Sequence, residues 1–130
     1  MRAKLLRGDE GERAAAKFLM DRGYRILACN YRTRLGEIDL IAEDRGTVVF
    51  IEVKARGTDR FGGPAEAITL AKQARIACLA QQFLSTRGLE ARPCRFDAVL
   101  ISEHEPGSQQ IELVTAAFEV PTSFGHRAPS

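Results

Sequence analysis

The segment GEIDLIAEDRGTVVFIEVKAR, residues 36–56, carries the strongest structural signal in the chain. Two runs rich in apolar and β-branched side chains, residues 37–42 and 47–53, flank the tripeptide Asp44-Arg45-Gly46. Strand-forming runs on either side of a short turn that contains glycine are typical of a β-hairpin. The sequence therefore predicts two antiparallel strands joined by this turn.

Charged side chains interrupt the hairpin toward its open end. Alternation along the first strand places Glu37 and Asp39 on one face and the intervening apolar side chains on the other. Along the second strand, Glu52 and Lys54 share a face, and Glu52 lies among apolar residues, where a charge is costly unless it is paired or holds a cation. If the register brings these faces together, the carboxylates suit Mg²⁺, which prefers oxygen ligands. Cross-strand ion pairs on a solvated face are the alternative.

Outward from the hairpin, the sequence predicts two helices and three further strands. Apolar side chains at helical spacing indicate helices over about residues 9–22 and 65–86, with Thr69 as a possible cap that divides the second. A glycine-rich loop, residues 57–63, precedes the second helix. Strands are expected at residues 24–29, 94–102 and 111–118. The order α-β-β-β-α-β-β indicates a single α/β domain, in which helices flank one mixed sheet.

Composition limits the classes of protein that remain. The chain has 130 residues, 45% of them hydrophobic and 28% charged, which is typical of one globular domain. Its longest apolar runs span only a few residues, so no membrane segment is expected. The amino end reads MRAKLLRGDEGER and lacks the apolar core of a secretory signal. The three widely spaced cysteines indicate reduced, buried thiols and a cytoplasmic protein; their positions are Cys29, Cys78 and Cys94.

Charge is distributed unevenly along the chain. Residues 1–34 hold nine basic and four acidic side chains, residues 35–53 hold one and five, and residues 54–97 hold eight and four. An acidic centre between basic flanks suits a metal site that is approached by a polyanion. A mixed, solvated surface is the alternative interpretation.

Four short segments make the prediction of the protein class more specific. Asp39 followed by Glu52-Val53-Lys54, on a hairpin that follows a helix, resembles the PD-(D/E)XK nuclease superfamily, which includes archaeal-type Holliday junction resolvases and many restriction enzymes. Ile38 stands where the superfamily label has proline, at a position that varies there. The four segments together resemble the YraN-type, endonuclease-like family of small bacterial proteins, over about residues 8–120: GERAA (11–15), GEIDLIA (36–42), FIEVKAR (50–56) and RFDAV (95–99).

This resemblance implies a restriction-endonuclease-like fold for residues 1–120. The last residues, 121–130, are expected to form a flexible tail. It implies a metal-dependent nuclease that hydrolyses phosphodiester bonds in DNA, with branched or damaged DNA as a candidate substrate. A module with the same fold that binds nucleic acid or a partner with little catalysis is the alternative, because a fold does not establish an activity. A homodimer is left open.

The resemblance also assigns residues to roles. Asp39, Glu52 and the backbone carbonyl of Val53 are expected to hold Mg²⁺ or Mn²⁺, and Lys54 is expected to position the attacking water. Glu12 of GERAA matches an acidic residue that relatives supply from the first helix, and Gln73 is a candidate from the second helix. These assignments make up the predicted catalytic set: Asp39, Glu52, Lys54, Glu12 and Gln73.

Five basic side chains are candidates for contacts with nucleic acid phosphates, although a solvated helix face remains the alternative for the last two of them: Arg32, Arg34, Arg56, Lys72 and Arg75. Two further residues receive structural interpretations. Asp97, next to basic and apolar residues, is predicted to form an ion pair within the fold, and Tyr31 to make a core contact instead of stacking on a base.

Overall fold

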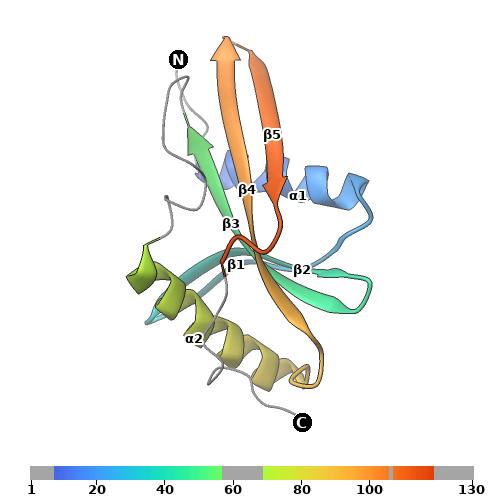
Figure 1. Ribbon diagram of the computed structural model, residues 1–130, viewed down its shortest axis with the longest axis vertical. Helices are drawn as coiled ribbons and strands as arrows, with labels where there is room; N and C mark the ends of the chain where they lie inside the picture. The colour runs from blue at the N-terminus through green and yellow to red at the C-terminus, as the bar shows by residue number, and fades with distance from the viewer. Residues whose placement is uncertain (1–7, 57–68, 106, 119–130) are drawn as a thin grey trace.

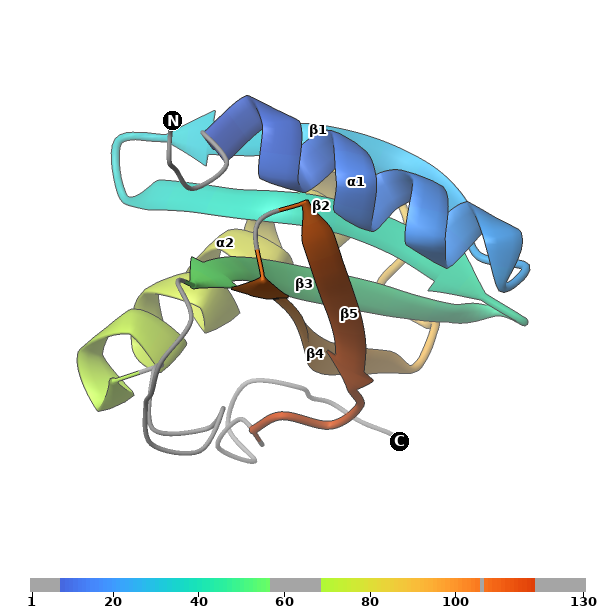
Figure 2. The same ribbon diagram turned by 90° about the horizontal axis from the view of Figure 1, so that it is seen from above.

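Five strands form one mixed sheet, with a helix on each face (Figures 1 and 2). The computed structural model describes residues 8–56, 69–105 and 107–118. The observed order matches the predicted α-β-β-β-α-β-β order and confirms the α/β domain. Its elements are α1 (Gly8–Asp21), β1 (Arg25–Thr33), β2 (Gly36–Asp44), β3 (Thr47–Arg56), α2 (Leu70–Arg87), β4 (Cys94–Glu105) and β5 (Ser108–Val114).

The sheet keeps its strands in sequence order, β1-β2-β3-β4-β5. Neighbouring strands are antiparallel except for β3 and β4, which are parallel. A parallel pair requires a crossover connection, and α2 is part of the connection between β3 and β4. The crossover places α2 on one face of the sheet, while α1 covers the other face (Figure 2).

The predicted hairpin is present as β2 and β3. Asp44 pairs with Thr47, so the turn itself has two residues, Arg45 and Gly46. Both have positive φ, 54° and 89°. Two central residues with positive φ form the turn whose twist matches that of the flanking strands, which explains why glycine lies here.

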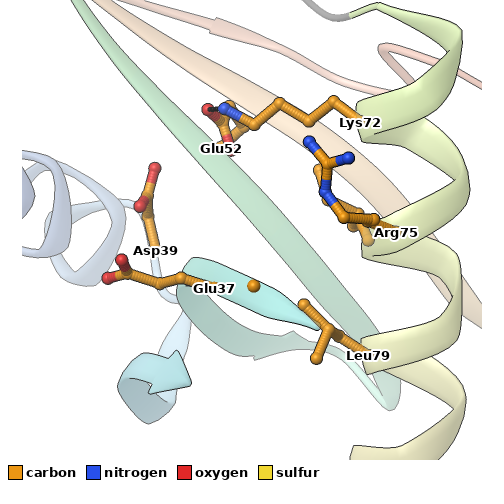
Figure 3. Close-up of a pocket in the computed structure, with 8 residues that line it drawn as sticks. Glu37, Asp39, Glu52, Lys72, Arg75 and Leu79 are labelled. Atoms are coloured by element: carbon orange, nitrogen blue, oxygen red, sulfur yellow. Dashed lines mark hydrogen bonds and ion pairs between the residues drawn. The ribbon is translucent and has the colours of Figure 1, made fainter. Parts of the chain in front are cut away.

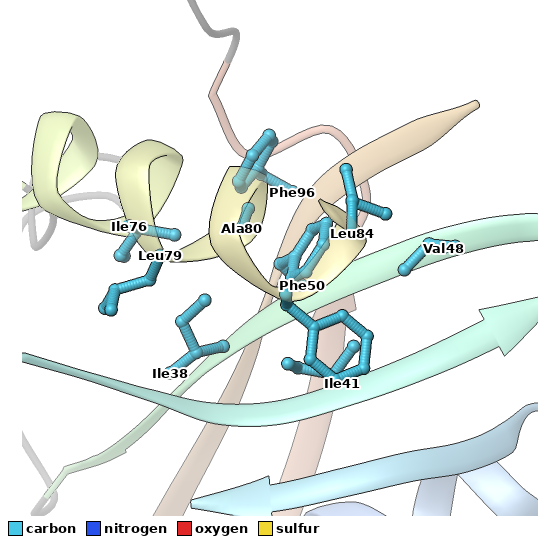
Figure 4. Packing of buried hydrophobic residues seen from close by; sticks show 10 residues of the cluster. Ile38, Ile41, Val48, Phe50, Ile76, Leu79, Ala80, Leu84 and Phe96 are labelled. Carbon is cyan, nitrogen blue, oxygen red and sulfur yellow. The ribbon is translucent and has the colours of Figure 1, made fainter. Parts of the chain in front are cut away.

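Each helix buries a separate apolar cluster against the sheet. Under α2, Ile38, Val48 and Phe50 pack against residues that include Leu79 and Phe83 (Figure 4). These side chains are almost fully buried. Phe50 and Phe83 meet edge to face, with ring centroids 6.1 Å apart, a geometry that adds to the area they bury.

The cluster under α1 shows that strict alternation along β2 is wrong at one point. Leu40 packs under α1 with Ile51 and Leu19. Ile38 and Ile41 both pack under α2, although they lie three positions apart. The change of face occurs at Asp39, where β2 separates from β3. On β1, the residue between the partners of Leu40 and Ile38 is Asn30, whose left-handed φ of 54° interrupts the regular alternation.

Several predicted boundaries shift. Helix α2 begins at Leu70, and Thr69 is its N-cap, accepting the backbone N–H of Lys72 at 3.1 Å. The predicted start at residue 65 and the glycine-rich loop lie outside the described residues. β1 runs on to Thr33. Strand β5 begins at Ser108 instead of residue 111, because β4 continues to Glu105 and pairs there with Ser108. It ends at Val114 instead of residue 118, and Ala116 just beyond it has a left-handed φ of 52°.

The cysteine prediction is wrong in part. Cys29 and Cys78 are exposed and Cys94 is half-buried, all three as free thiols. Cys29 lies on the edge strand β1, which explains its exposure. Across the described ranges, neither helix has the length and apolar character needed to cross a membrane. The expected tail, residues 121–130, lies outside the described residues.

Candidate functional site

Strands β2 and β3 separate in the middle of the hairpin. Their last paired residues are Leu40 and Ile51. Beyond this point the start of β2 continues to pair with β1, and the end of β3 continues to pair with β4. A cavity of about 190 Å³ lies at the separation, between the strands and α2 (Figure 3). Its lining residues are Gly36, Glu37, Asp39, Glu52, Lys72, Arg75, Ile76 and Leu79.

Asp39 holds the two separating strands together. Its Oδ2 accepts the backbone N–H of Val53 at 2.8 Å, in place of a strand-to-strand hydrogen bond. The N–H and C=O of a strand residue point to the same neighbour, so the Val53 carbonyl also faces the gap. Burial, together with the charges of Glu52, Glu12 and Glu37, raises the pKa of Asp39 to about 7, and the Val53 hydrogen bond opposes this shift only in part.

Two further carboxylates lie beside Asp39. One oxygen each of Glu12, Glu37 and Asp39 lies within 4.8 Å of the other two. Glu12 comes from α1; burial raises its pKa, against the lowering effect of hydrogen bonds to Asn30 and Asp39. Carboxylates this close repel one another when ionised. The cluster therefore gains stability from a proton or from a cation.

Glu52 is in a different electrostatic position from Asp39. Its side chain is only 6% exposed, yet two ammonium groups contact its Oε2. Nζ of Lys72, from α2, lies 2.5 Å away, and Nζ of Lys54, from the same strand, lies 3.7 Å away. The structure thus brings the predicted residues Asp39, Glu52 and Lys54 together, and it places Lys72 directly on Glu52.

One face of α2 contributes to the cavity. Lys72, Arg75, Ile76 and Leu79 follow the spacing of a single helical face and line it together. Arg75 also packs against the strand, because a Cβ at Gly36 would lie 3.8 Å from its Nε. The predicted residue Gln73 does not belong to this lining. This face could have been derived from the sequence, because Thr69 marks the start of the helix and helical spacing then places the four residues on one side of it.

Three other residues were predicted to contact phosphates, and neither of the two whose side chains are described is among the residues that line the cavity. Arg32 is exposed on β1, with its Nε 3.5 Å from Oε1 of Glu37. Arg34 is exposed in the turn between β1 and β2. Arg56 ends β3, and its side chain is not among those described. The structure therefore gathers Lys72 and Arg75 inside the cavity and leaves Arg32 and Arg34 outside it.

Sequence reasoning missed Asn30. This residue has φ of 54° within β1, a left-handed conformation that asparagine tolerates better than most residues. Its side chain hydrogen-bonds Glu12, which belongs to the acidic cluster. Strained backbone of this kind is often found beside functional sites. The only sequence signal was an asparagine inside a strand-forming run.

Asp97 forms the predicted structural ion pair. It is fully buried, and Arg95 donates to both of its oxygens, with Nε 3.0 Å from Oδ1 and Nη2 3.0 Å from Oδ2. The backbone N–H of Ala116 adds a third hydrogen bond at 2.9 Å. The core contact predicted for Tyr31 is confirmed as well, because its ring meets Phe83 edge to face with centroids 5.4 Å apart.

The fold and cavity define a small α/β domain with an acidic site where a β-hairpin opens. Comparison with known sequences adds the family: residues 11–101 match the Uncharacterised protein family UPF0102, and the chain belongs to this family. A UPF0102 protein of Symbiobacterium thermophilum is 51% identical over 111 residues, which cover 85% of this chain and 94% of the relative. A UPF0102 protein of Syntrophus aciditrophicus is 45% identical over 120 residues, covering 92% and 94%. One of Nitrosococcus oceani is 47% identical over 115 residues, covering 88% and 92%.

Proposed function

We propose that this protein is a metal-dependent nuclease of the PD-(D/E)XK superfamily that hydrolyses phosphodiester bonds in DNA, with branched or damaged DNA as a candidate substrate. One observation carries the proposal: Asp39 and Glu52 line the same cavity, and the Lys54 ammonium lies 3.7 Å from Glu52. This is the set of groups that the sequence resemblance assigns to the reaction.

The donor atoms of the cavity fit a hard divalent cation. Mg²⁺ and Mn²⁺ prefer carboxylate, carbonyl and water oxygens. Asp39 and Glu52 would supply carboxylate oxygens, and the Val53 carbonyl faces the same gap. The acidic cluster around Asp39 adds a reason for binding, because a cation relieves the repulsion among Glu12, Glu37 and Asp39.

A bound divalent cation supplies electrostatic stabilisation to the phosphate and acidifies a water. The side chains of this chain supply the remaining functions. Lys54 can hold the attacking water and neutralise charge that develops on the phosphate, because its ammonium lies 3.7 Å from Glu52, which lines the cavity. Glu12 lies beside Asp39 in the acidic cluster and can accept a hydrogen bond from a water in the cavity. Arg75 lines the cavity and can hold a neighbouring phosphate.

A second candidate function is supported by a different contact. The ion pair between Lys72 and Glu52 neutralises Glu52 without any metal ion. A cavity that is balanced in this way also suits a module that binds nucleic acid or a protein partner with little or no catalysis. The two candidates differ in what they require of Asp39 and Lys54, since a binding module needs neither for its affinity.

The test is a cleavage assay with labelled linear, nicked, flapped and four-way DNAs, in Mg²⁺, in Mn²⁺ and in chelator. We expect cation-dependent cleavage by the wild type and none by Asp39→Asn. Lys17→Ala is the matched control, because Lys17 lies on the exposed surface of α1, where it forms an ion pair with Asp21. Cleavage that Asp39→Asn retains, or a wild type that cuts no DNA in either metal, would overturn the proposal; in the second case the binding module becomes the better explanation.

A further inference from the structure

The two ammonium groups on Glu52 differ in where they come from. Lys54 belongs to the same strand as Glu52, whereas Lys72 reaches across the cavity from α2 and makes the shorter contact (Figure 3). The backbone at Lys72 is fixed, because its N–H donates to the N-cap Thr69. Its side chain is 34% exposed, so the flexible stem has room to rotate toward solvent.

We propose that Lys72 is a displaceable counter-ion: it neutralises Glu52 in the cation-free protein and transfers to a substrate phosphate when a divalent cation binds Glu52. The inference rests on the proposed metal site and adds a role for Lys72 that the nuclease resemblance does not assign. The oxygen concerned is Oε2 of Glu52, which contacts both lysines.

Charge around the cavity requires this exchange. A cation bound between Asp39 and Glu52 would lie within a few ångströms of the Lys72 ammonium, and like charges at such distances repel strongly where water is partly excluded. Glu52 is almost fully buried, so it cannot turn away from one of the two. Lys72 can turn away toward solvent, where the phosphate of a bound nucleic acid offers it a negative charge outside the carboxylate cluster that holds the cation.

Arg75 provides a matched control for this inference. It lies one helical turn after Lys72, lines the same cavity and carries the same charge. No ion pair between Arg75 and Glu52 is present among the described residues. Removing Arg75 therefore changes the charge of the cavity in the same way as removing Lys72, without freeing Glu52.

The first experiment measures Mn²⁺ binding by calorimetry to the full chain of the wild type, Lys72→Met and Arg75→Met. We expect Lys72→Met to bind Mn²⁺ about tenfold more tightly than the wild type, because the competing ammonium is gone, and Arg75→Met to gain clearly less. Unchanged or weaker binding by Lys72→Met, or an equal gain in Arg75→Met, overturns the inference and leaves the metal site intact. If neither the wild type nor Lys72→Met binds Mn²⁺, both the inference and the proposed metal site are overturned.

The second experiment measures the affinity of the wild type and of Lys72→Met for a short DNA, in Ca²⁺ and in chelator. A gel checks that the DNA stays uncut during the measurement. In Ca²⁺, Lys72→Met should bind the DNA severalfold more weakly than the wild type, because a phosphate contact is lost. In chelator the loss should be clearly smaller, because Glu52 holds Lys72 and only the net charge of the cavity changes. An equal loss in both conditions overturns the transfer to phosphate. Lys72→Gln, which keeps a polar group beside Glu52, replaces Lys72→Met in both experiments if circular dichroism shows that the methionine variant is unfolded.

Discussion

Asp39 accepts the backbone N–H of Val53 at 2.8 Å, across the point where β2 and β3 separate. Here a side-chain carboxylate replaces a backbone carbonyl as the hydrogen-bond acceptor, so β2 and β3 stay connected although their backbones no longer pair. The opening of the hairpin and the position of the Asp39 carboxylate therefore have one structural cause.

The raised pKa of Asp39 predicts how stability depends on pH in the metal-free protein. The pKa moves from 3.8 to about 7 on folding, mainly through burial. Below about pH 4 both folded and unfolded states hold the proton, and between pH 4 and 7 only the folded state does. The free energy of unfolding should therefore fall as pH rises through this window, and the loss is complete above pH 7.

The variant Asp39→Asn should lose this contribution, because an amide does not ionise while its oxygen can still accept the Val53 N–H. In urea denaturation with chelator present, we expect it to match the wild type at pH 4 and to exceed it by a few kcal/mol at pH 8. The control is Asp21→Asn, which removes an exposed carboxylate of α1. Parallel pH curves for Asp39→Asn and the wild type would contradict the prediction.

The buried pair of Asp97 and Arg95 predicts a large loss of stability. Asp97→Ala leaves the Arg95 guanidinium without its main partner and removes an acceptor from the Ala116 N–H. Breaking a buried ion pair from one side costs about 3–5 kcal/mol. Urea denaturation should show this loss for Asp97→Ala. The double variant Arg95→Met/Asp97→Leu should lose clearly less, because it leaves no buried charge, and an equal loss in both proteins would refute the explanation.

Much of the fold could be predicted because its signals are local. The positive φ of Arg45 and Gly46 follows from the turn chemistry of the hairpin, and the N-cap at Thr69 follows from residue type and helical spacing. Asp97 was predicted to form an ion pair because Arg95 and apolar residues lie next to it in the chain, where a carboxylate needs a partner. Each of these inferences depends on residues that are close together in the chain or on a rule that holds at any buried position.

The geometry of the site could not be predicted in the same way. The separation of β2 from β3 depends on how each strand pairs with its outer neighbour, and the contact of Lys72 with Glu52 depends on how α2 lies on the sheet. Neither is encoded within a single strand or helix. Cys78 was predicted to be buried and is exposed for a related reason, because helical spacing alone does not say which face of α2 meets the sheet.

Arg34 and Arg75 predict salt-dependent binding of nucleic acid. Each phosphate contact contributes about 0.7–0.9 to the slope of log affinity against log salt concentration. Arg34→Ala and Arg75→Ala should each lower the slope by about this amount, measured with a short DNA in a fluorescence anisotropy titration. Arg45→Ala is the matched control, because Arg45 is 93% exposed at the turn, at the other end of the hairpin. An equal change of slope in all three variants would mean that only net charge matters.

Lys54 predicts a loss of rate without a loss of fold or binding. Its ammonium lies 3.7 Å from Glu52, and from there we expect it to act on the attacking water and on charge that builds up on the phosphate. A group that acts mainly in the transition state lowers the rate more than the affinity when it is removed. Lys54→Ala should therefore lower the single-turnover rate of cation-dependent cleavage by on the order of 10²–10³, while DNA affinity changes little.

Asp39→Ala and Glu52→Ala should fail in a different way from Lys54→Ala. Each removes an oxygen donor, so calorimetry should show weakened Mn²⁺ binding, and the loss of a negative charge near the phosphates should leave DNA affinity unchanged or increased. Lys54→Ala should keep its Mn²⁺ binding or tighten it, because the lysine contributes no donor to the cation and its ammonium contacts the same Glu52 oxygen as Lys72. If Lys54→Ala cleaves at the wild-type rate while Asp39→Ala is inactive, the nuclease activity is confirmed, and a group other than Lys54 positions the attacking water. If all three variants lose Mn²⁺ binding alike, Lys54 supports the arrangement of Glu52 and does not act on the substrate.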